Sequence, residues 1–351
     1  MEIGVGIDER LGLDYAQQRE LVREAARLGY ASVWSPSSVT SHDAFHTCVQ
    51  WFQASGLSTG ISVVPAPVWT PVALASQAAT VGELTEGRFI LGIGPGSIHL
   101  AAFRRTFGLP EQPPIALMRD YLTIVRGLLA GERVDYAGRT LSLRGVQLGF
   151  RPAHVPVYLA ALGPQMLRLA GQLADGVAPN WASPEQIAWS RERVAEGARR
   201  AGRDPGGIPI IQYIRVCVDD DEAAARRALG AQLLAYALAR PGTPTTQGYR
   251  GLFGRMGFDT LLTELEARRD AGESHERLVE ALPDDLLRRV GYYGKPDGAA
   301  VALEHLAEGL DVAIVRIITL RPSLESALVA LRACRPGDPT DSSQYSAELG
   351  T

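Results

Sequence analysis

PVYLAALGPQMLRLAGQLADGVAPN, residues 156–180, combines a strand, a turn and a helix in one short span. The apolar run at 157–162 is typical of a strand that is buried on both faces. Gly163 and Pro164 end this run, and Pro164 suits the first position of a helix, where its missing N–H is not needed. The apolar residues then recur at helical spacing, and a second apolar run begins at Val177. The stretch therefore predicts a strand, a helix and another strand with short connections, which is typical of parallel α/β proteins.

The same order of strand and helix repeats along the chain. We expect eight strands, at about residues 3–7, 31–35, 57–64, 88–93, 157–162, 177–178, 208–218 and 312–318. Eight such units predict a (β/α)8 TIM barrel, an α/β fold that uses about 250 residues. The remaining residues predict a small hairpin at about 133–150 and an insertion at about 240–295, which contains helices near 258–270 and 276–291. We expect a single domain over 1–335 and a flexible tail over 336–351, because the tail is small, polar and charged.

Composition excludes several classes of protein. The 351 residues are 46% hydrophobic and 21% charged, and the net charge is −4, so no basic field for nucleic acid is present. Cys48, Cys217 and Cys334 lie far apart, which argues against a zinc cluster or a disulfide framework and favours a reducing cytoplasm. The start MEIGVGID has no basic and apolar leader, and no apolar run is long enough to cross a membrane. We therefore expect a cytoplasmic protein that acts on a small molecule.

In a barrel of this kind the loops after the strands form the active face. The turn at Gly163 and Pro164 directs free backbone N–H groups outward from the start of a helix, where an anion can bind. Many such turns bind nothing, so the turn alone leaves both interpretations open.

Several motifs in order along the chain carry a family resemblance. They are EIGVGID, GYASVW, ISVVPAPVWTPVALA, RFILGIGPGS, VYLAALGPQMLRLAGQLADGV and PDDLLRRVGYYGKPDGAAVALEHL. Together they resemble the luciferase-like flavin and deazaflavin oxidoreductases over about residues 1–335. Within that superfamily they are most similar to the coenzyme F420-dependent branch, which includes methylenetetrahydromethanopterin reductase and F420-dependent glucose-6-phosphate dehydrogenase. Coenzyme F420 is accordingly the expected cofactor, and FMN is the alternative.

The resemblance implies where this cofactor lies. Its ring would rest on the bulged end of the third strand, supported by a non-prolyl cis peptide between Ser62 and Val63. Its phosphate and ribityl chain would run over the loop at 161–166 and near Asp175 and Gly176, and Asn180 is placed to hydrogen-bond the head group. The cofactor-binding residues implied are Ser62, Val63, Val64, Ala161, Leu162, Gly163, Pro164, Gln165, Met166, Asp175, Gly176 and Asn180.

The chain departs from the family at its titratable positions. Relatives commonly carry Asp-His after the second strand, whereas this chain has Ser37 and Ser38, and Ser97 stands where many relatives have a carboxylate. A serine can hydrogen-bond a carbonyl, but its pKa is far too high for a general base near neutral pH. The pattern therefore disfavours alcohol oxidation and favours hydride donation to an activated C=N or C=C bond.

Other side chains of the same loops are candidates for the remaining roles. His99 and His42 can deliver a proton at pH 7, although a histidine in a loop is more often solvated. His42 and His46 lie four residues apart without a third ligand, so we expect no metal. Trp69 and Trp181 are candidates for the substrate pocket, although Trp69 could equally pack under its loop. Lys295 or Arg168 could supply a cation beside the phosphate.

The leading hypothesis is a reductase that delivers hydride from reduced F420 to a pterin-like substrate or a biosynthetic intermediate. An FMN-dependent monooxygenase on the same scaffold is the first alternative. A non-catalytic cofactor-binding paralogue is the second, since it too would have lost titratable residues. The resemblance also implies a homodimer, in which pairing would cover the outer helices two and three.

Overall fold

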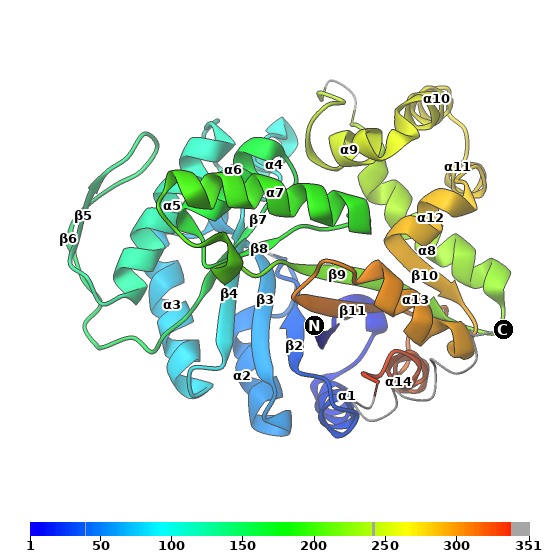
Figure 1. Cartoon of the computed structure of the whole chain (residues 1–351), viewed down its shortest axis with the longest axis horizontal. Helices are drawn as coiled ribbons and strands as arrows, with labels where there is room; N and C mark the ends of the chain where they lie inside the picture. The colour runs from blue at the N-terminus through cyan, green and yellow to red at the C-terminus, as the bar shows by residue number, and fades with distance from the viewer. Residues whose placement is uncertain (39, 241–242, 338–351) are drawn as a thin grey trace.

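A curled parallel sheet of nine strands forms the centre of the molecule in the computed structural model (Figure 1). The structure describes residues 1–38, 40–240 and 243–337, so nearly all of the predicted flexible tail lies outside it. The strands are β1 (Glu2–Gly6), β2 (Ser32–Ser35), β3 (Ser58–Pro65), β4 (Phe89–Gly94), β7 (Val157–Ala160), β8 (Gly176–Ala178), β9 (Ile211–Val218), β10 (Gly291–Gly294) and β11 (Val312–Ile318). They pair in the order β10-β9-β11-β1-β2-β3-β4-β7-β8.

Most of the helices cover the outer face of this sheet, whereas those within residues 248–280 lie at the upper right, away from it (Figure 1). They are α1 (Tyr15–Arg27), α2 (Ala44–Ser55), α3 (Pro71–Leu84), α4 (Ala101–Phe107), α5 (Pro114–Leu129), α6 (Pro164–Leu173), α7 (Pro184–Arg200), α8 (Glu222–Ala237), α9 (Gly248–Phe253), α10 (Asp259–Asp270), α11 (His275–Glu280), α12 (Asp284–Val290), α13 (Ala299–Leu306) and α14 (Leu324–Ala333). Neighbouring helices pack along the outside in the series α1, α2, α3, α5, α6 and α7. The main apolar core lies between these helices and the sheet.

The sheet curls until strands from its two ends meet. Two isolated bridges join Val177 to Ile210 and Asn180 to Tyr213, across the gap between β8 and β9. Only bridges, and no continuous ladder, are formed there by the described residues. The structure thus confirms the predicted α/β fold with eight parallel strands, each close to its expected position, in a curled sheet.

Strand β10 is the element that the sequence did not predict. Its sequence GYYG is short and half glycine, and the residues before it were expected to form one helix over 276–291. That helix is instead two helices, α11 and α12, separated at Pro283. β10 pairs with the carboxyl half of β9, where Gly291 faces Arg215. A Cβ at Gly291 would lie 2.8 Å from the carbonyl oxygen of Arg215, so glycine permits this close pairing.

The interior of the curl is filled by side chains that alternate along the strands. A second apolar cluster lies there, formed by Trp34, Tyr158, Ala178, Ile211, Tyr213 and Ile314. Space for these large rings comes from glycines on adjacent strands: a Cβ at Gly60 would lie 2.3 Å from Trp34 Cζ3. The interior is therefore a packed core, and its carboxyl end forms the floor of the face where the strand-to-helix loops gather.

The predicted hairpin and insertion are both present. β5 (Val134–Ala137) and β6 (Ser142–Val146) pair antiparallel and extend to the left in Figure 1. Asp120 of α5 holds the hairpin, since its carboxylate accepts hydrogen bonds from Tyr136 and Thr140 at 2.6–2.7 Å and from the Leu141 N–H at 2.9 Å. The insertion forms α9 to α12 at the upper right of Figure 1, with a π-helical turn at Gly254–Phe258.

Candidate active site

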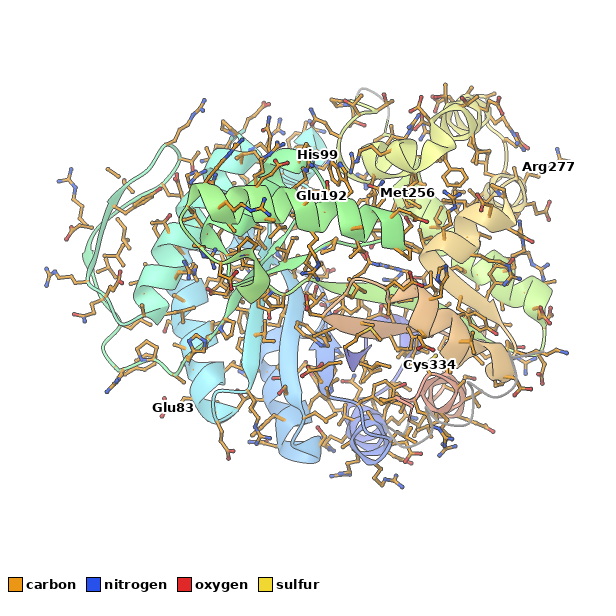
Figure 2. All side chains as sticks on the ribbon, in the orientation of Figure 1. Glu83, His99, Glu192, Met256, Arg277 and Cys334 are labelled. Carbon is orange, nitrogen blue, oxygen red and sulfur yellow. The ribbon has the colours of Figure 1, made fainter. Side chains whose placement is uncertain are left out.

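The carboxyl ends of the strands define the candidate active face. Figure 2 labels Glu83 just before β4 and His99 just after it, at opposite ends of the molecule. The predicted residues Ser37, Ser38 and His42 follow β2, Ser97 and His99 follow β4, and Asn180 follows β8. Parallel strands bring the loops at their carboxyl ends to one edge of a sheet, so these residues belong to one face of the molecule.

The end of β3 has the geometry that the resemblance implied. The peptide bond between Ser62 and Val63 is cis, and the pairing with β4 shifts register between Ile61 and Val64. Both sequence-based expectations, the cis bond and the bulge, are thereby confirmed. Ser62 and Val63 are half-buried, whereas Val64 is fully buried in the main core. Of the three predicted residues, Ser62 and Val63 are thus the ones that can meet a ligand.

Two glycines of β4 make room for this bulge. A Cβ at Gly94 would lie 3.0 Å from Val63 Cγ2 and 3.0 Å from Ala160 Cβ. A Cβ at Gly92 would lie 2.9 Å from Val63 Cγ1 and 2.3 Å from the carbonyl oxygen of Ile61. Val63 therefore lies against bare backbone, and the ends of β3, β4 and β7 present small apolar groups. Such a surface suits one face of a planar ring.

The loop after β7 begins α6 as the sequence predicted. Pro164 is the first helical residue, and Gly163, the residue before it, contributes no side-chain cap. Ala161 and Met166 are buried, whereas Pro164 and Gln165 are exposed. The backbone N–H groups of this first turn are therefore open to an anion.

A cation that the sequence did not indicate lies at this loop. Arg255, from the π-helical turn of the insertion, donates a hydrogen bond of 2.8 Å to the carbonyl oxygen of Leu162. Its guanidinium lies 4.8 Å from the centre of the Trp189 ring. Arg168, which was one of the two expected cations, instead pairs with Glu196 at 2.7 Å. Sequence reasoning missed Arg255 because it is nearly a hundred positions away from the loop and belongs to no motif.

Asp175 and Gly176 lie at the opposite end of the sheet from this loop, so their predicted place in the cofactor site is wrong. Asp175 precedes β8, and its carboxylate accepts a 2.9 Å hydrogen bond from the N–H of Val157, the first residue of β7. Arg126 holds the same carboxylate with bonds of 2.7 and 3.2 Å. Gly176 provides space for Tyr158, since a Cβ there would lie 2.5 Å from the ring. Residues that precede a strand face the amino end, which is why this pair has a structural role.

The hydroxyl and imidazole groups occupy the loops after β2 and β4. Ser38 Oγ lies 3.1 Å from Thr40 Oγ1, and the ring of His42 lies 5.0 Å from that of Tyr15. His42 lines a shallow hollow with Glu9, Thr40 and Ser41. Burial, and then the charges of Arg240 and Arg104, lower the pKa of His99. His99 is consequently neutral at pH 7, which weakens its predicted role as a proton donor.

The two tryptophans expected in the substrate pocket differ in exposure. Trp69 is half-buried and meets Phe45 edge-on, with ring centres 5.6 Å apart. Trp181 is fully buried, and the guanidinium of Arg215 lies 3.8 Å from its ring centre. Trp181 thus lies beneath a charged side chain and does not line an open pocket, which corrects the sequence-based expectation.

Charged side chains inside the curl are the largest feature that the sequence analysis missed. Arg316 of β11 binds Asp8 Oδ2 with Nε at 3.0 Å and Nη2 at 2.5 Å, and both side chains are buried. Arg215 of β9 donates a 2.7 Å hydrogen bond to Asn180 Oδ1, and Asn180 in turn donates one of 2.8 Å to the hydroxyl of Tyr249. In the sequence, each of these two arginines stands inside a mostly apolar strand, IQYIRVCV for Arg215 and VAIVRII for Arg316. An arginine in such a strand is the signal that could indicate a buried charge.

Burial alone would raise the pKa of Asp8. The charges of Arg316 and Arg10, and the hydrogen bonds that both donate, outweigh burial, so the pKa of Asp8 lies below its usual value. Asp8 is therefore ionised and is the counter-ion of Arg316. It is unsuited to act as a general base near pH 7.

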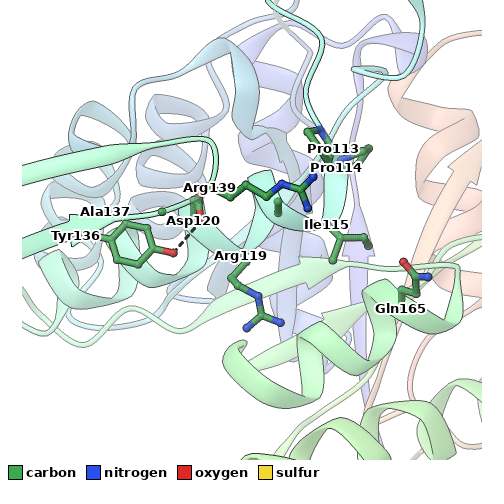
Figure 3. Close-up of a pocket in the computed structure, with 11 residues that line it drawn as sticks. Pro113, Pro114, Ile115, Arg119, Asp120, Tyr136, Ala137, Arg139 and Gln165 are labelled. Atoms are coloured by element: carbon green, nitrogen blue, oxygen red, sulfur yellow. Dashed lines mark hydrogen bonds between the residues drawn. The ribbon is translucent and has the colours of Figure 1, made fainter.

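A second hollow lies beside the loop after β7 (Figure 3). Its lining includes Pro113 and Pro114 before and at the start of α5, Arg139 in the hairpin turn, and Gln165 at the start of α6. Neither hollow includes Ser62 or Val63. Within 1–38, 40–240 and 243–337, no three His, Cys, Asp or Glu residues are grouped so as to hold a metal. In the same residues, no helix has the length and apolar character that crossing a bilayer requires.

The parallel strands, the helices outside them and the bulged third strand define an α/β protein of barrel type with its site at the carboxyl ends. The family model described as luciferase-like monooxygenase matches residues 2–312, and the chain belongs to this family.

Named relatives show which members of this family the chain is similar to. A 5,10-methylenetetrahydromethanopterin reductase of Methanolobus tindarius is 27% identical over 309 residues, which are 87% of this chain and 90% of the relative. An F420-dependent glucose-6-phosphate dehydrogenase of Microbacterium testaceum is 27% identical over 77% of this chain and 81% of its own. The solved structure of the coenzyme F420-dependent tetrahydromethanopterin reductase of Methanopyrus kandleri has a TM-score of 0.75 at 22% identity, covering 95% of this chain and 98% of that one.

Proposed function

We propose that this protein is an F420-dependent oxidoreductase that reduces an activated C=N or C=C bond of a small molecule, either a pterin-like compound or a biosynthetic intermediate. The observation that carries the proposal is the bulged end of β3, where the Val63 side chain lies against Gly92 and Gly94 of β4. This arrangement offers a bare surface to a planar ring at the active face. The relatives that are named as F420-dependent enzymes support deazaflavin as that ring.

The described residues fit the other parts of the coenzyme. The N–H groups at the start of α6 and the guanidinium of Arg255 favour its phosphate near Gly163. We propose that Asn180, which is predicted from the sequence to lie at this face, binds the head group. When bound in its reduced form, F420 supplies a hydride to the acceptor. The protein's part is to hold the ring and the acceptor in contact and to keep water away from them.

The polar groups in the loops after β2 and β4 favour reduction. Ser37, Ser38 and Ser97 can donate hydrogen bonds to an acceptor but cannot take a proton from an alcohol at pH 7. His99 is kept neutral by burial and by two arginines, which lower its pKa. An acceptor such as an iminium or a conjugated double bond is already activated, and it needs only orientation and polarisation by these hydroxyls.

The test is to titrate the purified protein with F420 and, separately, with FMN, and to measure binding by calorimetry and by fluorescence. We expect tight binding of F420 and little affinity for FMN. A screen of imines and enones with reduced F420 should then identify acceptors that are reduced. Tight binding of FMN with F420 ignored would contradict the proposal.

Two alternatives remain distinguishable in the same experiment. An FMN-dependent monooxygenase is favoured by the description of the family, and it would bind FMN and consume oxygen once the flavin is reduced. A non-catalytic paralogue is favoured by the three serines at titratable positions. It would bind a cofactor tightly and turn over no acceptor.

Finer features of the molecule form part of the proposal. We propose that residues 1–335 are a single domain, that the sheet closes as a (β/α)8 barrel through the bridges between β8 and β9, and that the protein works in the cytoplasm. We also propose a homodimer that covers α2 and α3. Support for this interface comes from Leu84, which ends α3 with 52% of its surface exposed. Light scattering of wild type and of Leu84→Glu tests it, since the variant should dissociate.

A further inference from the structure

Arg215 is a buried cation that the proposed function leaves unexplained. None of its surface is exposed, and its Nη1 donates a 2.7 Å hydrogen bond to Asn180 Oδ1. Its Nε and Nη2 have no acceptor among residues 1–38, 40–240 and 243–337. A buried donor without a partner is costly, and a buried charge without a counter-ion is more so. The Nε and Nη2 groups of Arg215 therefore remain free to donate hydrogen bonds to a further oxygen atom.

The surroundings of Arg215 provide aromatic faces but no counter-ion. Its guanidinium lies 3.8 Å from the ring centre of Trp181 and 5.6 Å from that of Tyr236. No carboxylate of the described residues is within ion-pair distance of it. The adjacent Arg316, its partner across the β9–β11 pairing, is matched by Asp8. Two arginines thus lie next to each other in the sheet, and the carboxylate of Asp8 pairs with Arg316, so the excess positive charge belongs to Arg215.

The position of Arg215 connects it to the proposed cofactor site. It lies one layer nearer to the carboxyl ends than Tyr213, whose neighbour across the bridge is Asn180. Asn180, Tyr236 and Tyr249 are each half-buried, and Asn180 follows β8 at the carboxyl end of the sheet, so Arg215 lies toward the face where the strand-to-helix loops gather. Burial and the charge of Arg316 lower the pKa of Arg215 to about 9, which still leaves it charged at pH 7.

We propose that Arg215, together with Asn180, binds an anionic carbonyl oxygen of the deazaflavin ring. The inference rests on the proposed function and specifies how the ring is oriented. Loss of a proton from a deazaflavin spreads negative charge over the ring to its carbonyl oxygens. An oxygen of this kind would occupy the free Nε and Nη2 donors of Arg215 and neutralise the excess charge, while the aromatic side chains keep water away.

The experiment compares wild type with Arg215→Gln, Arg215→Lys and the control Arg203→Gln. Arg203 is half-buried and bonds the carbonyl oxygen of Gly171 at 2.9 Å, in the segment that leads into the amino end of β9. Folding is checked by circular dichroism. The dissociation constant for F420 is measured by fluorescence, and the pKa of the bound ring is read from its visible absorbance as pH is varied.

We expect the pKa of the bound ring to lie below that of free F420 in wild type. Arg215→Gln should weaken F420 binding about tenfold or more and raise the pKa of the bound ring by about one, because an adjacent opposite charge has effects of this size. Arg215→Lys should restore most of the pKa effect, because it restores the charge. Arg203→Gln should match wild type.

Several results would overturn the inference while the proposed function stands. One is a folded Arg215→Gln variant with the affinity and bound-ring pKa of wild type. Another is a change confined to the KM of the acceptor, which would place the anion on the substrate. If Arg215→Gln fails to fold, wild type decides: a bound ring with the pKa of free F420 refutes the contact. If wild type binds no F420, the proposed function itself fails.

Discussion

The buried ion pair between Asp8 and Arg316 leads to a quantitative prediction about the free energy of unfolding. It joins the first and last strands of the chain, since Gly6 of β1 pairs with Arg316 of β11 and Asp8 follows two positions later. The side chains of Asp8 and Arg316 are 5% and 8% exposed. Replacing Asp8 by Asn leaves a buried guanidinium without its counter-ion. We expect the free energy of unfolding to fall by about 3–5 kcal/mol, the usual effect of breaking a buried pair.

The same pair fixes the direction of a pH effect. The pKa of Asp8 in the folded protein lies below its ordinary value of 3.8, because two arginines outweigh the effect of burial. Its contribution to stability is therefore fully present above pH 3.8 and is lost as pH falls through the lower, folded value. Asp8→Asn should lack this contribution at every pH. The difference in stability between wild type and variant should accordingly shrink in acid.

Urea unfolding of wild type, Asp8→Asn, Arg316→Gln and the double variant measures the coupling between the two side chains. The control is Asp285→Asn, which removes an exposed partner of Arg289 at 3.2 Å and should cost less than about 1 kcal/mol. We expect the double variant to be less destabilised than the sum of the single variants. A loss for Asp8→Asn no larger than that of the control would refute the argument that burial makes this pair matter.

Three further predictions follow from single contacts. Asp120→Asn should weaken the anchoring of the β5–β6 hairpin by about 2 kcal/mol, seen as faster amide exchange there, whereas the exposed Asp135→Asn should have little effect. Gly94→Val should lower F420 affinity at least about tenfold, because its side chain would enter the space against Val63, while Gly207→Ala, which meets nothing within 4 Å, should not. Arg255→Gln should weaken F420 about tenfold yet leave unchanged the binding of a deazaflavin that lacks the phosphate.

The strands and most of the helices could be predicted because their signals are local. A short apolar run that alternates with helical segments predicts a buried strand wherever it stands, and eight such runs predict eight strands. Pro164 marked the start of α6 for the same reason. The cis bond at Ser62 and Val63 came from the family resemblance, since no local pattern in ISVVP distinguishes it from a trans strand.

What could not be predicted depends on contacts between distant residues. β10 consists of GYYG, which becomes a strand only because β9 offers a free edge from Arg215 to Val218. Arg255 reaches the loop at Leu162 only because the insertion folds over α6 and α7. The place of Asp175 in the cofactor site comes from the family resemblance, and the local sequence LADGV does not show at which end of the sheet this residue lies. Helix α6, between the loop after β7 and Asp175, carries the chain from one end of the sheet to the other.

The mouth of the curled sheet is divided into two chemically different halves, and this division decides how a flat ligand can lie in it. On the side of β3, β4 and β7, the Val63 side chain meets Gly94 and Ala160, with no charge among them. On the side of β11 and β9, Arg316 is neutralised by Asp8, whereas Arg215 has no carboxylate within ion-pair distance in the described part of the chain. A ring with an apolar face and one anionic end has a single favourable orientation between these halves, with its face on Val63 and its anionic end toward β9. In the reverse orientation, the anionic end of the ring would lie against Gly94 and Val63, and Arg215 would remain unpaired. Under the proposed contact, the charge of Arg215 would therefore set the orientation of the ring before any contact with the acceptor is made.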